Sequence, residues 1–422
     1  MTGERSVKIR NVRLYTGEEE YKRGALVTEG AYVKYAGPEE GAPEDPETVD
    51  GQGGILMSGL ANSHTHAAMV LFRGVGSDLG LMDWLGRLMP AEDALTPEMV
   101  HDGTLLACGE MLKNGVTAFA DMYRHMDAAF EAALESGIRA NMNRGSSGRD
   151  GVDSHREWAK RWHGAGDGRI RVTMGLHAEY TSDEDTVRYA VETARELGLG
   201  MHLHLSETEG EVAGCVERHG VRPVEYFDRM GLFDGPVIAA HCVHINDEER
   251  AFLARKGVWM AHCPASNLKL GSGVFDLVGA LDAGCRVCLG TDGASSNNGL
   301  DMYREMYLTA LLPKGMRKDP TRPRAGECVN IATRHGCLAM GYEDVGLLRP
   351  GYRADWVLLK DDVGLMPGHD AAADIVYAAQ GGMVRMTAVN GRVLYRDGEW
   401  ADIDMERVKA RCREHARTLG VL

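Results

Sequence analysis

Apolar residues follow two different patterns along the chain. Near the amino end they form short runs separated by turn residues, at 7–15, 24–28 and 31–37, which predict strands. From Ile55 onward a short apolar run is followed by a loop and a segment of helical periodicity, and this unit recurs to about residue 350. The apolar runs of this second part are 55–57, 115–122, 138–143, 170–177, 200–205, 236–241, 257–262 and 285–292. Eight strands that alternate with helices predict an α/β fold of the (β/α)8 TIM barrel type.

Helical periodicity fills most of the gaps between these runs. The predicted helices are 81–88, 96–114, 183–197, 221–230 and 247–255. Thr96 followed by Pro97 is typical of a helix start. Beyond residue 350 strand patterns return at 354–359, 383–389 and 391–398, before a closing helix at 405–419.

Because both ends of the chain are rich in predicted strands, we expect them to pair into one small β-sandwich beside the barrel. The expected division is 1–56 and 351–422 for the sandwich and closing helix, and 57–350 for the catalytic barrel.

Composition narrows the function. The chain has 422 residues, of which 44% are hydrophobic and 26% charged, as in ordinary globular proteins. Its net charge of -15 and the lack of a Lys/Arg cluster argue against nucleic acid as a partner. The sequence contains no run of about 18 apolar residues, so it predicts no membrane span. The charged amino-terminal stretch and an odd number of scattered cysteines, nine, favour the reducing cytoplasm.

Cys285 and Cys288 have the CxxC spacing of redox and zinc sites, but their neighbours are typical of a buried strand. His177-Ala-Glu179 followed by this CxxC also imitates the signature of cytidine-type zinc deaminases. Gly284 stands where that signature has Pro, and several strand–helix units separate the two halves. We therefore set both interpretations aside.

Histidines and carboxylates gather at the ends of the predicted barrel strands, where such barrels carry their active sites. His64 and His66 follow the first strand, and their i, i+2 spacing turns both imidazoles to one side. The others are His177 after the fourth strand, His204 and Glu207 after the fifth, His241 after the sixth and Asp292 after the eighth. Imidazoles and a carboxylate are ligands that zinc prefers. The predicted ligand set is His64, His66, His204 and Asp292.

Several longer motifs carry a family resemblance. They are Asn62–His66, His202–Thr208, Ala240–His244, His262–Gly271 and Gly290–Asn298. On these motifs the chain resembles the amidohydrolase superfamily, in its deaminase and chlorohydrolase branch, and within it most resembles the 5-methylthioadenosine/S-adenosylhomocysteine deaminases. The similarity runs over nearly the whole length.

The resemblance implies one divalent metal per subunit, Zn²⁺ with Fe²⁺ as the alternative, on the ligand set given above. His177 stands at the end of the fourth strand, where two-metal relatives carry a bridging lysine. His202 lies on the same strand face as His204 and is the competing ligand. His204 is preferred because Glu207 follows it by three residues, as in the family.

The resemblance also implies catalytic roles. Asp292 would take a proton from the attacking water, His241 would orient that water, and Glu207 would protonate a ring nitrogen. The structural alternatives are that Glu207 caps the helix that begins near Glu209, and that His241 is a buried histidine at a strand end.

Substrate contacts follow from the same likeness. Glu92, in the segment that begins at Trp84, would bind the ribose hydroxyls, and Trp84 would line the same site. The residues implied for the rest of the substrate are Arg144 and Arg156 for an amino-acid carboxylate and His177 for the purine. The alternative is a surface helix carboxylate and two solvated loop arginines.

One position departs from the family. His177-Ala-Glu179-Tyr180 replaces the usual His-Ser/Ala-Pro-Tyr, so that a carboxylate is added close to the expected pocket and a stiffening proline is lost. This change is expected to tune substrate preference.

The predicted activity is hydrolytic deamination, at a C–N bond of a cyclic amidine, of 5′-substituted adenosines such as S-adenosylhomocysteine, 5′-methylthioadenosine, adenosine and 5′-deoxyadenosine. Two alternatives remain: a deaminase or chlorohydrolase of another aminated ring (guanine, cytosine or a triazine), and a metal-free structural relative. The expected partner is a small nucleoside, with no nucleic acid or membrane, and we expect a homo-oligomer.

Overall fold

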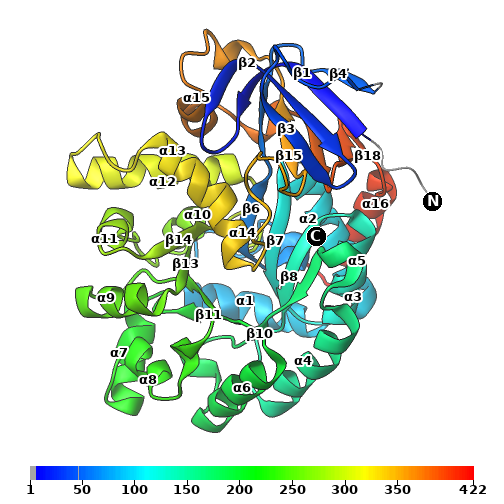
Figure 1. Ribbon diagram of the computed structural model, residues 1–422. Coiled ribbons are helices and arrows are strands. Elements are labelled where there is room, and N and C mark those ends of the chain that lie inside the picture. Colours follow the sequence, from blue (N-terminus) through cyan, green and yellow to red (C-terminus); the bar gives the residue numbers. More distant parts are fainter. Residues whose placement is uncertain (1–5, 46) are drawn as a thin grey trace.

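A computed structural model describes residues 6–45 and 47–422. Its strands form a nine-stranded sheet and two parallel sheets of five and four strands. Figure 1 shows the nine-stranded sheet at the top of the molecule and the parallel strands below it, with helices around them.

The nine-stranded sheet joins the two ends of the chain. From the amino-terminal part come β1 (Ser6–Tyr15), β2 (Glu20–Glu29), β3 (Tyr32–Pro38), β4 (Thr48–Asp50) and β5 (Ile55–Ser58). From the carboxy-terminal part come β15 (Trp356–Leu359), β16 (Val384–Val389), β17 (Arg392–Arg396) and β18 (Glu399–Trp400). The order is β18-β17-β16-β15-β5-β1-β2-β3, and β4 pairs with β1. The two ends meet where β5 pairs antiparallel with β15, so the strands of both ends pair, as predicted.

The parallel strands follow the predicted runs. The four-stranded sheet holds β6 (Leu60–Thr65), β7 (Val116–Met122), β8 (Arg139–Asn143) and β9 (Ile170–Val172); the five-stranded sheet holds β10 (Met174–Gly175), β11 (Met201–Leu205), β12 (Val237–His241), β13 (Trp259–His262) and β14 (Arg286–Leu289). Thr173 alone separates β9 from β10, so the predicted strand 170–177 is divided between the two sheets. Cys288 is buried within β14 and Cys285 is buried directly before it, in line with the strand interpretation of the CxxC.

The first predicted barrel strand, 55–57, was wrong. Residues 55–58 form β5 of the nine-stranded sheet, and the first parallel strand is β6. Gly59 separates the two strands, and its N–H donates to the carbonyl of Asp355 at 3.1 Å. A Cβ at Gly59 would lie 2.1 Å from Oγ1 of Thr117. The chain thus passes from one sheet to the other in a space that only glycine fits, and one apolar run contains two strands.

Helices surround both the parallel strands and the nine-stranded sheet, where α15 lies (Figure 1). Their bounds are α1 (Leu81–Asp93), α2 (Pro97–Lys113), α3 (Met126–Ser136), α4 (Arg149–Trp162), α5 (Ala165–Gly168), α6 (Glu184–Leu197), α7 (Glu209–His219), α8 (Pro223–Asp228), α9 (Asp247–Lys256), α10 (Pro264–Lys269), α11 (Leu277–Asp282), α12 (Met302–Arg317), α13 (Ala325–Asn330), α14 (Gly336–Ala339), α15 (Ala371–Tyr377) and α16 (Met405–Thr418). Short turns are η1 (Ala67–Phe72), η2 (Glu179–Thr181), η3 (Leu232–Asp234), η4 (Ile331–His335), η5 (Val363–Leu365) and η6 (Gly381–Met383). Among the described residues, none of these helices is long and apolar enough to cross a membrane.

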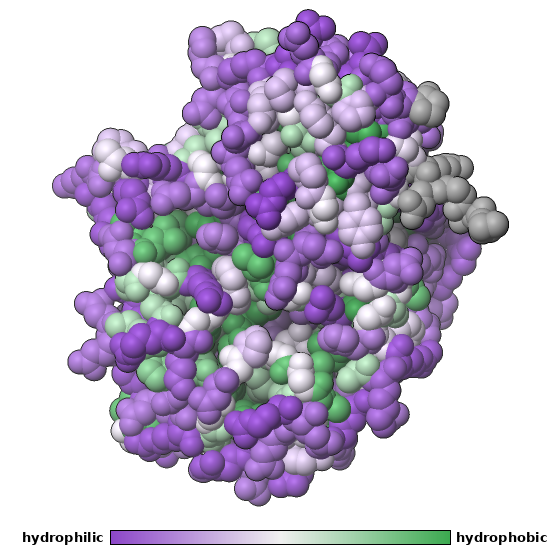
Figure 2. Space-filling view, viewed as in Figure 1, coloured by the Kyte–Doolittle hydropathy of each residue, from purple (hydrophilic) through white to green (hydrophobic). Residues whose placement is uncertain are grey.

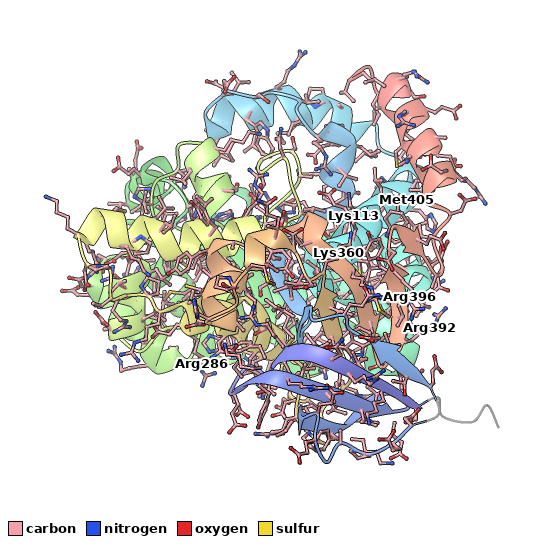
Figure 3. All side chains as sticks on the ribbon, turned by 90° about the horizontal axis from the view of Figure 1, so that it is seen from above. Lys113, Arg286, Lys360, Arg392, Arg396 and Met405 are labelled. Carbon is pink, nitrogen blue, oxygen red and sulfur yellow. The ribbon has the colours of Figure 1, made fainter. Side chains whose placement is uncertain are left out.

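The observed bounds of two helices can be compared with those predicted from the sequence. Oγ1 of Thr96 accepts the N–H of Met99, so α2 begins as predicted. α1 continues through Pro90 to Asp93, beyond the predicted end at Leu88, and so carries Glu92 on a helix. The closing helix α16 packs on α2, where a Cβ at Gly109 would meet Cε of Met405 at 1.9 Å. Figure 3 labels Met405, at the start of α16, and Lys113, at the end of α2.

A buried ion pair ties the parallel strands to the nine-stranded sheet. Arg139, the first residue of β8, donates from Nε to Oδ2 of Asp355 at 2.6 Å and from Nη2 to Oδ1 at 3.0 Å. The Asp355 carboxylate also accepts the N–H of Asn390 at 2.8 Å. Both side chains of the pair are 2% exposed or less.

In Figure 2 most of the visible face is hydrophilic, and apolar side chains show mainly below the nine-stranded sheet.

Candidate metal centre

The four predicted ligands come together from three separate segments. His64 lies on β6, His66 just after it, His204 on β11 and Asp292 in the loop after β14. Nε2 of His66 is 3.3 Å from Oδ1 of Asp292, and Nε2 of His64 is 3.6 Å from the same oxygen. Nε2 of His204 is 3.4 Å from Nε2 of His66. Imidazole nitrogens and a carboxylate oxygen this close together are the arrangement expected of a cation site.

The outward ring nitrogens are held by other groups. Nδ1–H of His204 donates to the carbonyl of His177 at 2.8 Å, and Nδ1–H of His66 donates to the carbonyl of Met122. Nδ1 of His64 lies 2.9 Å from Nε2 of His202. His202 therefore stands behind His64, and His204 is the one that faces the cluster. A hydrogen bond at the ring nitrogen that faces away from the metal orients a metal-binding histidine.

A divalent cation fits this donor set. Nε2 of His64 is buried and has no hydrogen-bond partner among the described residues. A buried polar atom without a partner is destabilising, and coordination would satisfy it. Two imidazoles held at Nδ1, a third with an unsatisfied Nε2 and a carboxylate match the chemistry of a zinc site.

Charge in the cluster is shared unevenly. Burial, and then the neighbouring imidazoles, hold the pKa values of His64 and His204 well below their usual range. Burial also disfavours charge on His66, but its hydrogen bond to Asp292 outweighs this and raises the pKa of His66 to about 9. Burial works against the Asp292 anion as well, yet bonding to His66 keeps the pKa of Asp292 well below normal. A bound cation would replace the His66 proton, because metal ligands must be deprotonated.

Asp292 is held in place by its own loop. Its Oδ2 accepts hydrogen bonds from Oγ of Ser266 at 2.6 Å and Oγ of Ser296 at 2.7 Å, and its Oδ1 accepts the N–H of Gly293 at 2.7 Å. Its φ of 60° lies in the left-handed region, which costs free energy and is often found at functional sites. The N–H of Asp292 donates to the carbonyl of His64 at 2.9 Å, so the last strand's loop meets the first parallel strand.

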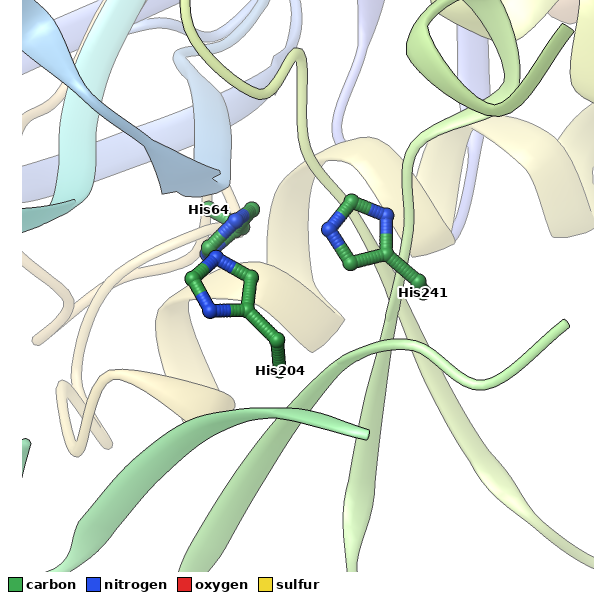
Figure 4. Close-up of side chains that lie close together, drawn as sticks. All are labelled: His64, His204 and His241. Atoms are coloured by element: carbon green, nitrogen blue, oxygen red, sulfur yellow. The ribbon is translucent and has the colours of Figure 1, made fainter. Parts of the chain in front are cut away.

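Glu207 and His241 lie beside the cluster. Figure 4 shows the rings of His64, His204 and His241 facing one space. Nδ1–H of His241 donates to Oδ1 of Asn267 at 2.8 Å, so its Nε2 points inward, 3.8 Å from Oε2 of Glu207. Asn267 lies in the His262–Gly271 motif, but only the structure shows that it holds the His241 ring in this orientation.

The capping alternative for Glu207 is not observed. Thr208 caps α7 by accepting the N–H of Glu211 at 3.1 Å. Glu211 in turn accepts the N–H groups of Ser206 and Glu207, each at 2.7 Å. The Glu207 side chain is thereby left to the site, where its Oε1 accepts from Oγ of Ser272 at 3.0 Å.

The other predicted substrate residues fall at different distances from the cluster. Glu92 is buried, and its Oε1 accepts from the hydroxyl of Tyr123 at 2.8 Å. The Tyr123 ring centroid is 6.4 Å from that of His66, so Glu92 is one side chain away from the cluster. The His177 ring is 4.9 Å from that of His204. Trp84 is 4% exposed and packs in the main hydrophobic core.

The two predicted arginines lie in different surroundings. Arg144 is exposed directly after β8, and its N–H donates to Nε2 of His155 at 3.3 Å. Arg156 lies within α4, where its guanidinium donates to Glu196 at 2.7 Å and Thr193 at 3.2 Å on α6. The structure does not bring Arg156 to the histidine cluster, because its helix turns it toward α6.

Glu179 has partners that the sequence did not predict. Its side chain is fully buried, and its carboxylate accepts hydrogen bonds from Arg218 and His219. The added carboxylate is therefore engaged by cationic and imidazole donors instead of facing the site.

Comparisons with known proteins agree with these motifs. Residues 55–394 match the Amidohydrolase family. The 5-methylthioadenosine/S-adenosylhomocysteine deaminase of Pelotomaculum thermopropionicum is 40% identical over 409 residues, 94% of each chain. That of Moorella thermoacetica is 43% identical over 399 residues, 92% of this chain and 93% of the relative. An adenosine deaminase from Xanthomonas campestris with bound zinc has a TM-score of 0.94 at 30% identity, covering 99% of both chains. The protein has a TIM-barrel-like α/β fold and belongs to the amidohydrolase family.

Proposed function

We propose that this protein is a metal-dependent deaminase that hydrolyses the 6-amino group of 5′-substituted adenosines and releases ammonia and the inosine analogue. The observation that carries the proposal is that two overlapping triads share His64: His64, His66 and Asp292, and His64, His204 and His241. Nε2 of His204 also lies 3.4 Å from Nε2 of His66, and Glu207 lies beside His241. The near-full-length similarity to enzymes named 5-methylthioadenosine/S-adenosylhomocysteine deaminases supports the substrate class.

The four converging side chains would hold one divalent ion. We propose Zn²⁺, with Fe²⁺ as the alternative, because the similar adenosine deaminase binds zinc. Such an ion lowers the pKa of water to roughly 7 and so makes hydroxide available at neutral pH.

Three side chains would then move the protons. Asp292 accepts a proton from the attacking water, and His241 orients that water through Nε2, which Asn267 keeps turned inward. Glu207 donates a proton to the purine ring nitrogen next to the attacked carbon, so negative charge does not build up on the ring. The water oxygen would bond to that carbon, and the proton taken up by Asp292 would pass to the amino group. The C–N bond would then break and release ammonia, while the added hydroxyl returns a proton to Glu207 and becomes the carbonyl of the inosine analogue.

Substrate recognition would use the groups around the cluster. Glu92 would accept hydrogen bonds from the ribose hydroxyls, Trp84 of the same helix would line this part of the site, and His177 would contact the purine. Arg144, exposed at the end of β8, would pair with the carboxylate of a longer substrate. Arg156 has no part in this proposal, because Glu196 and Thr193 already hold its guanidinium.

We further propose that the parallel strands close into a barrel, with the boundary near Gly59 instead of residue 57 and the end near 350. The hydrogen bond between Asp292 and His64 across the open edge supports closure. The nine-stranded sheet would bend into a sandwich around one apolar cluster that includes Ile9, Leu26, Leu56, Trp356 and Met386 from both chain ends.

We also propose a cytoplasmic homo-oligomer. The nine cysteines are unpaired and buried, which suits a reducing compartment. Exposed apolar side chains on α10 and α12, namely Leu268, Tyr307, Leu311 and Met316, are candidates for contacts between subunits. Sedimentation of the purified protein tests the assembly, and a monomer at all concentrations would refute it.

Ammonia release tests the function directly. The zinc- or iron-loaded protein is incubated with S-adenosylhomocysteine, 5′-methylthioadenosine, adenosine, 5′-deoxyadenosine, guanine, cytosine and a triazine. We expect release from the adenosine derivatives. Turnover of a free base or triazine without release from any adenosine derivative would refute the substrate class.

Replacement of Glu92 by Ala should raise KM for adenosine derivatives roughly 10–150-fold, because a charged hydrogen bond to the ribose contributes about 1.5–3 kcal/mol. Steady-state kinetics with each nucleoside measures the effect. Tyr123→Phe is the matched control: it removes the hydroxyl that bonds to Oε1 of Glu92 but keeps the carboxylate. An unchanged kcat/KM in Glu92→Ala would mean that this side chain does not touch the sugar.

A further inference from the structure

Glu179 links two loops of the site. It is the first residue of η2, two positions after His177. Its carboxylate accepts Nε–H of Arg218 at 3.0 Å and Nε2–H of His219 at 2.8 Å, and its other oxygen accepts a second bond from the Arg218 guanidinium. The Glu179 side chain is fully buried. Charge-assisted hydrogen bonds to a buried carboxylate are among the stronger polar contacts in proteins.

The partners of Glu179 are fixed at the far end of α7. Arg218 and His219 are the last two residues of this helix, which begins two residues after Glu207. The His219 ring stacks on Tyr226 of α8, with centroids 4.2 Å apart and planes at 29°. A Cβ at Gly214 would lie 2.8 Å from Nη1 of Arg218, so this helical glycine leaves room for the guanidinium. Glycine is unfavourable inside a helix, which indicates that the space is used.

The loop that Glu179 anchors also supports the metal centre. The carbonyl of His177 accepts both the backbone N–H of His204, at 3.0 Å, and its Nδ1–H, at 2.8 Å. Nδ1 of His177 itself lies 3.1 Å from Oγ1 of Thr181, at the other end of η2. A shift of this turn would therefore move the His177 ring and loosen the support of His204.

We propose that Glu179, Arg218 and His219 form a clamp that positions the His177 loop against α7 and so sets how tightly the purine is held. The expected effect of the clamp on the kinetics rests on the proposed function. The contacts that form the clamp do not depend on it. Ala178 has φ −157° and ψ 172°, an extended backbone that would also accept proline at the next position. A turn that proline would stiffen through its ring is here stiffened by ionic hydrogen bonds. Glu179 is thus a positioning residue and need not touch the substrate.

Kinetics of four variants test the clamp. Glu179→Ala is expected to lower kcat/KM for the best adenosine derivative roughly 10–100-fold, mainly through KM, because a misplaced binding group is costly. Glu179→Gln keeps one acceptor and should lie between Glu179→Ala and the wild type. Arg218→Ala should lower kcat/KM at least as much as Glu179→Ala does. The double variant Glu179→Ala/Arg218→Ala should lower kcat/KM no more than Glu179→Ala alone, because the two residues act as one unit.

The matched control is Glu184→Ala, which breaks the exposed pair of Glu184 with Arg188 on α6 and should leave kcat/KM unchanged. Hydrogen–deuterium exchange of the segment 176–182 gives a readout independent of turnover: exchange should rise in Glu179→Ala and stay unchanged in the control. Inactive wild-type protein would refute the proposed function, while exchange would still test the clamp. Additive losses in the double variant, or unchanged exchange in Glu179→Ala, would refute the clamp itself.

Discussion

Glu207→Gln should lower kcat for adenosine derivatives about 10²–10⁴-fold, the usual contribution of a general acid–base residue. The amide has nearly the same shape and can keep the hydrogen bond from Ser272, but it cannot deliver a proton to the purine ring. KM should change less than kcat, because the glutamine amide can still donate a hydrogen bond to the ring nitrogen and the ribose contacts lie elsewhere. Stopped assays of ammonia release, with bound metal measured in the same samples, give both quantities.

Glu209→Gln is the matched control for this experiment. Glu209 is exposed two positions further along, in the first turn of α7, and lies outside the metal cluster. It should keep wild-type kcat. If Glu207→Gln kept full metal content and a kcat within about threefold of the wild type, far inside the range expected of a general acid–base residue, Glu207 would not be the proton donor.

The metal centre could be predicted because its signal is local. His64 and His66 are two residues apart on extended backbone, and the carboxyl ends of parallel strands meet at one edge. The same rule brings His204 and Asp292 to that edge, but His177 and His241 as well, so the choice of the ligand set also used the family resemblance. The choice of His204 over His202 agrees with the geometry, in which His202 supports His64 from behind.

Partners of buried or helical charges could not be predicted in this way. Arg156 pairs with Glu196 and Glu179 with Arg218, each about 40 residues away along the chain. Nothing in the sequence near Arg156 says that its helix presents it to α6 instead of to the site. Likewise, the run from Ile55 is apolar on both sides of Gly59, so hydrophobic patterning alone could not show that the chain changes sheets there.

Asp355→Ala should lower the free energy of unfolding by about 3–5 kcal/mol, the usual cost of leaving a buried charge without its partner. Asp355 binds Arg139 through two hydrogen bonds and also accepts the N–H of Asn390, so its loss strands a guanidinium between β8 and the nine-stranded sheet. Urea unfolding followed by circular dichroism measures the effect. Asp344→Ala, which breaks a half-exposed pair with Arg353, should cost no more than about 1 kcal/mol.

A second substitution separates the charge from the packing. Removing both charges, in Arg139→Met/Asp355→Ala, should recover a large part of the lost stability, because an apolar side chain of similar length can replace the guanidinium without a stranded charge. The N–H of Asn390 would still lack its acceptor, so recovery should stop short of the wild type by about 1–3 kcal/mol. If the double variant were less stable than Asp355→Ala, the guanidinium would be stabilising the junction through contacts other than the carboxylate, such as the Tyr342 ring 5.5 Å away. Whether the free energy of unfolding of the double variant lies above or below that of Asp355→Ala therefore decides whether the ion pair or the packing around it joins the two sheet systems.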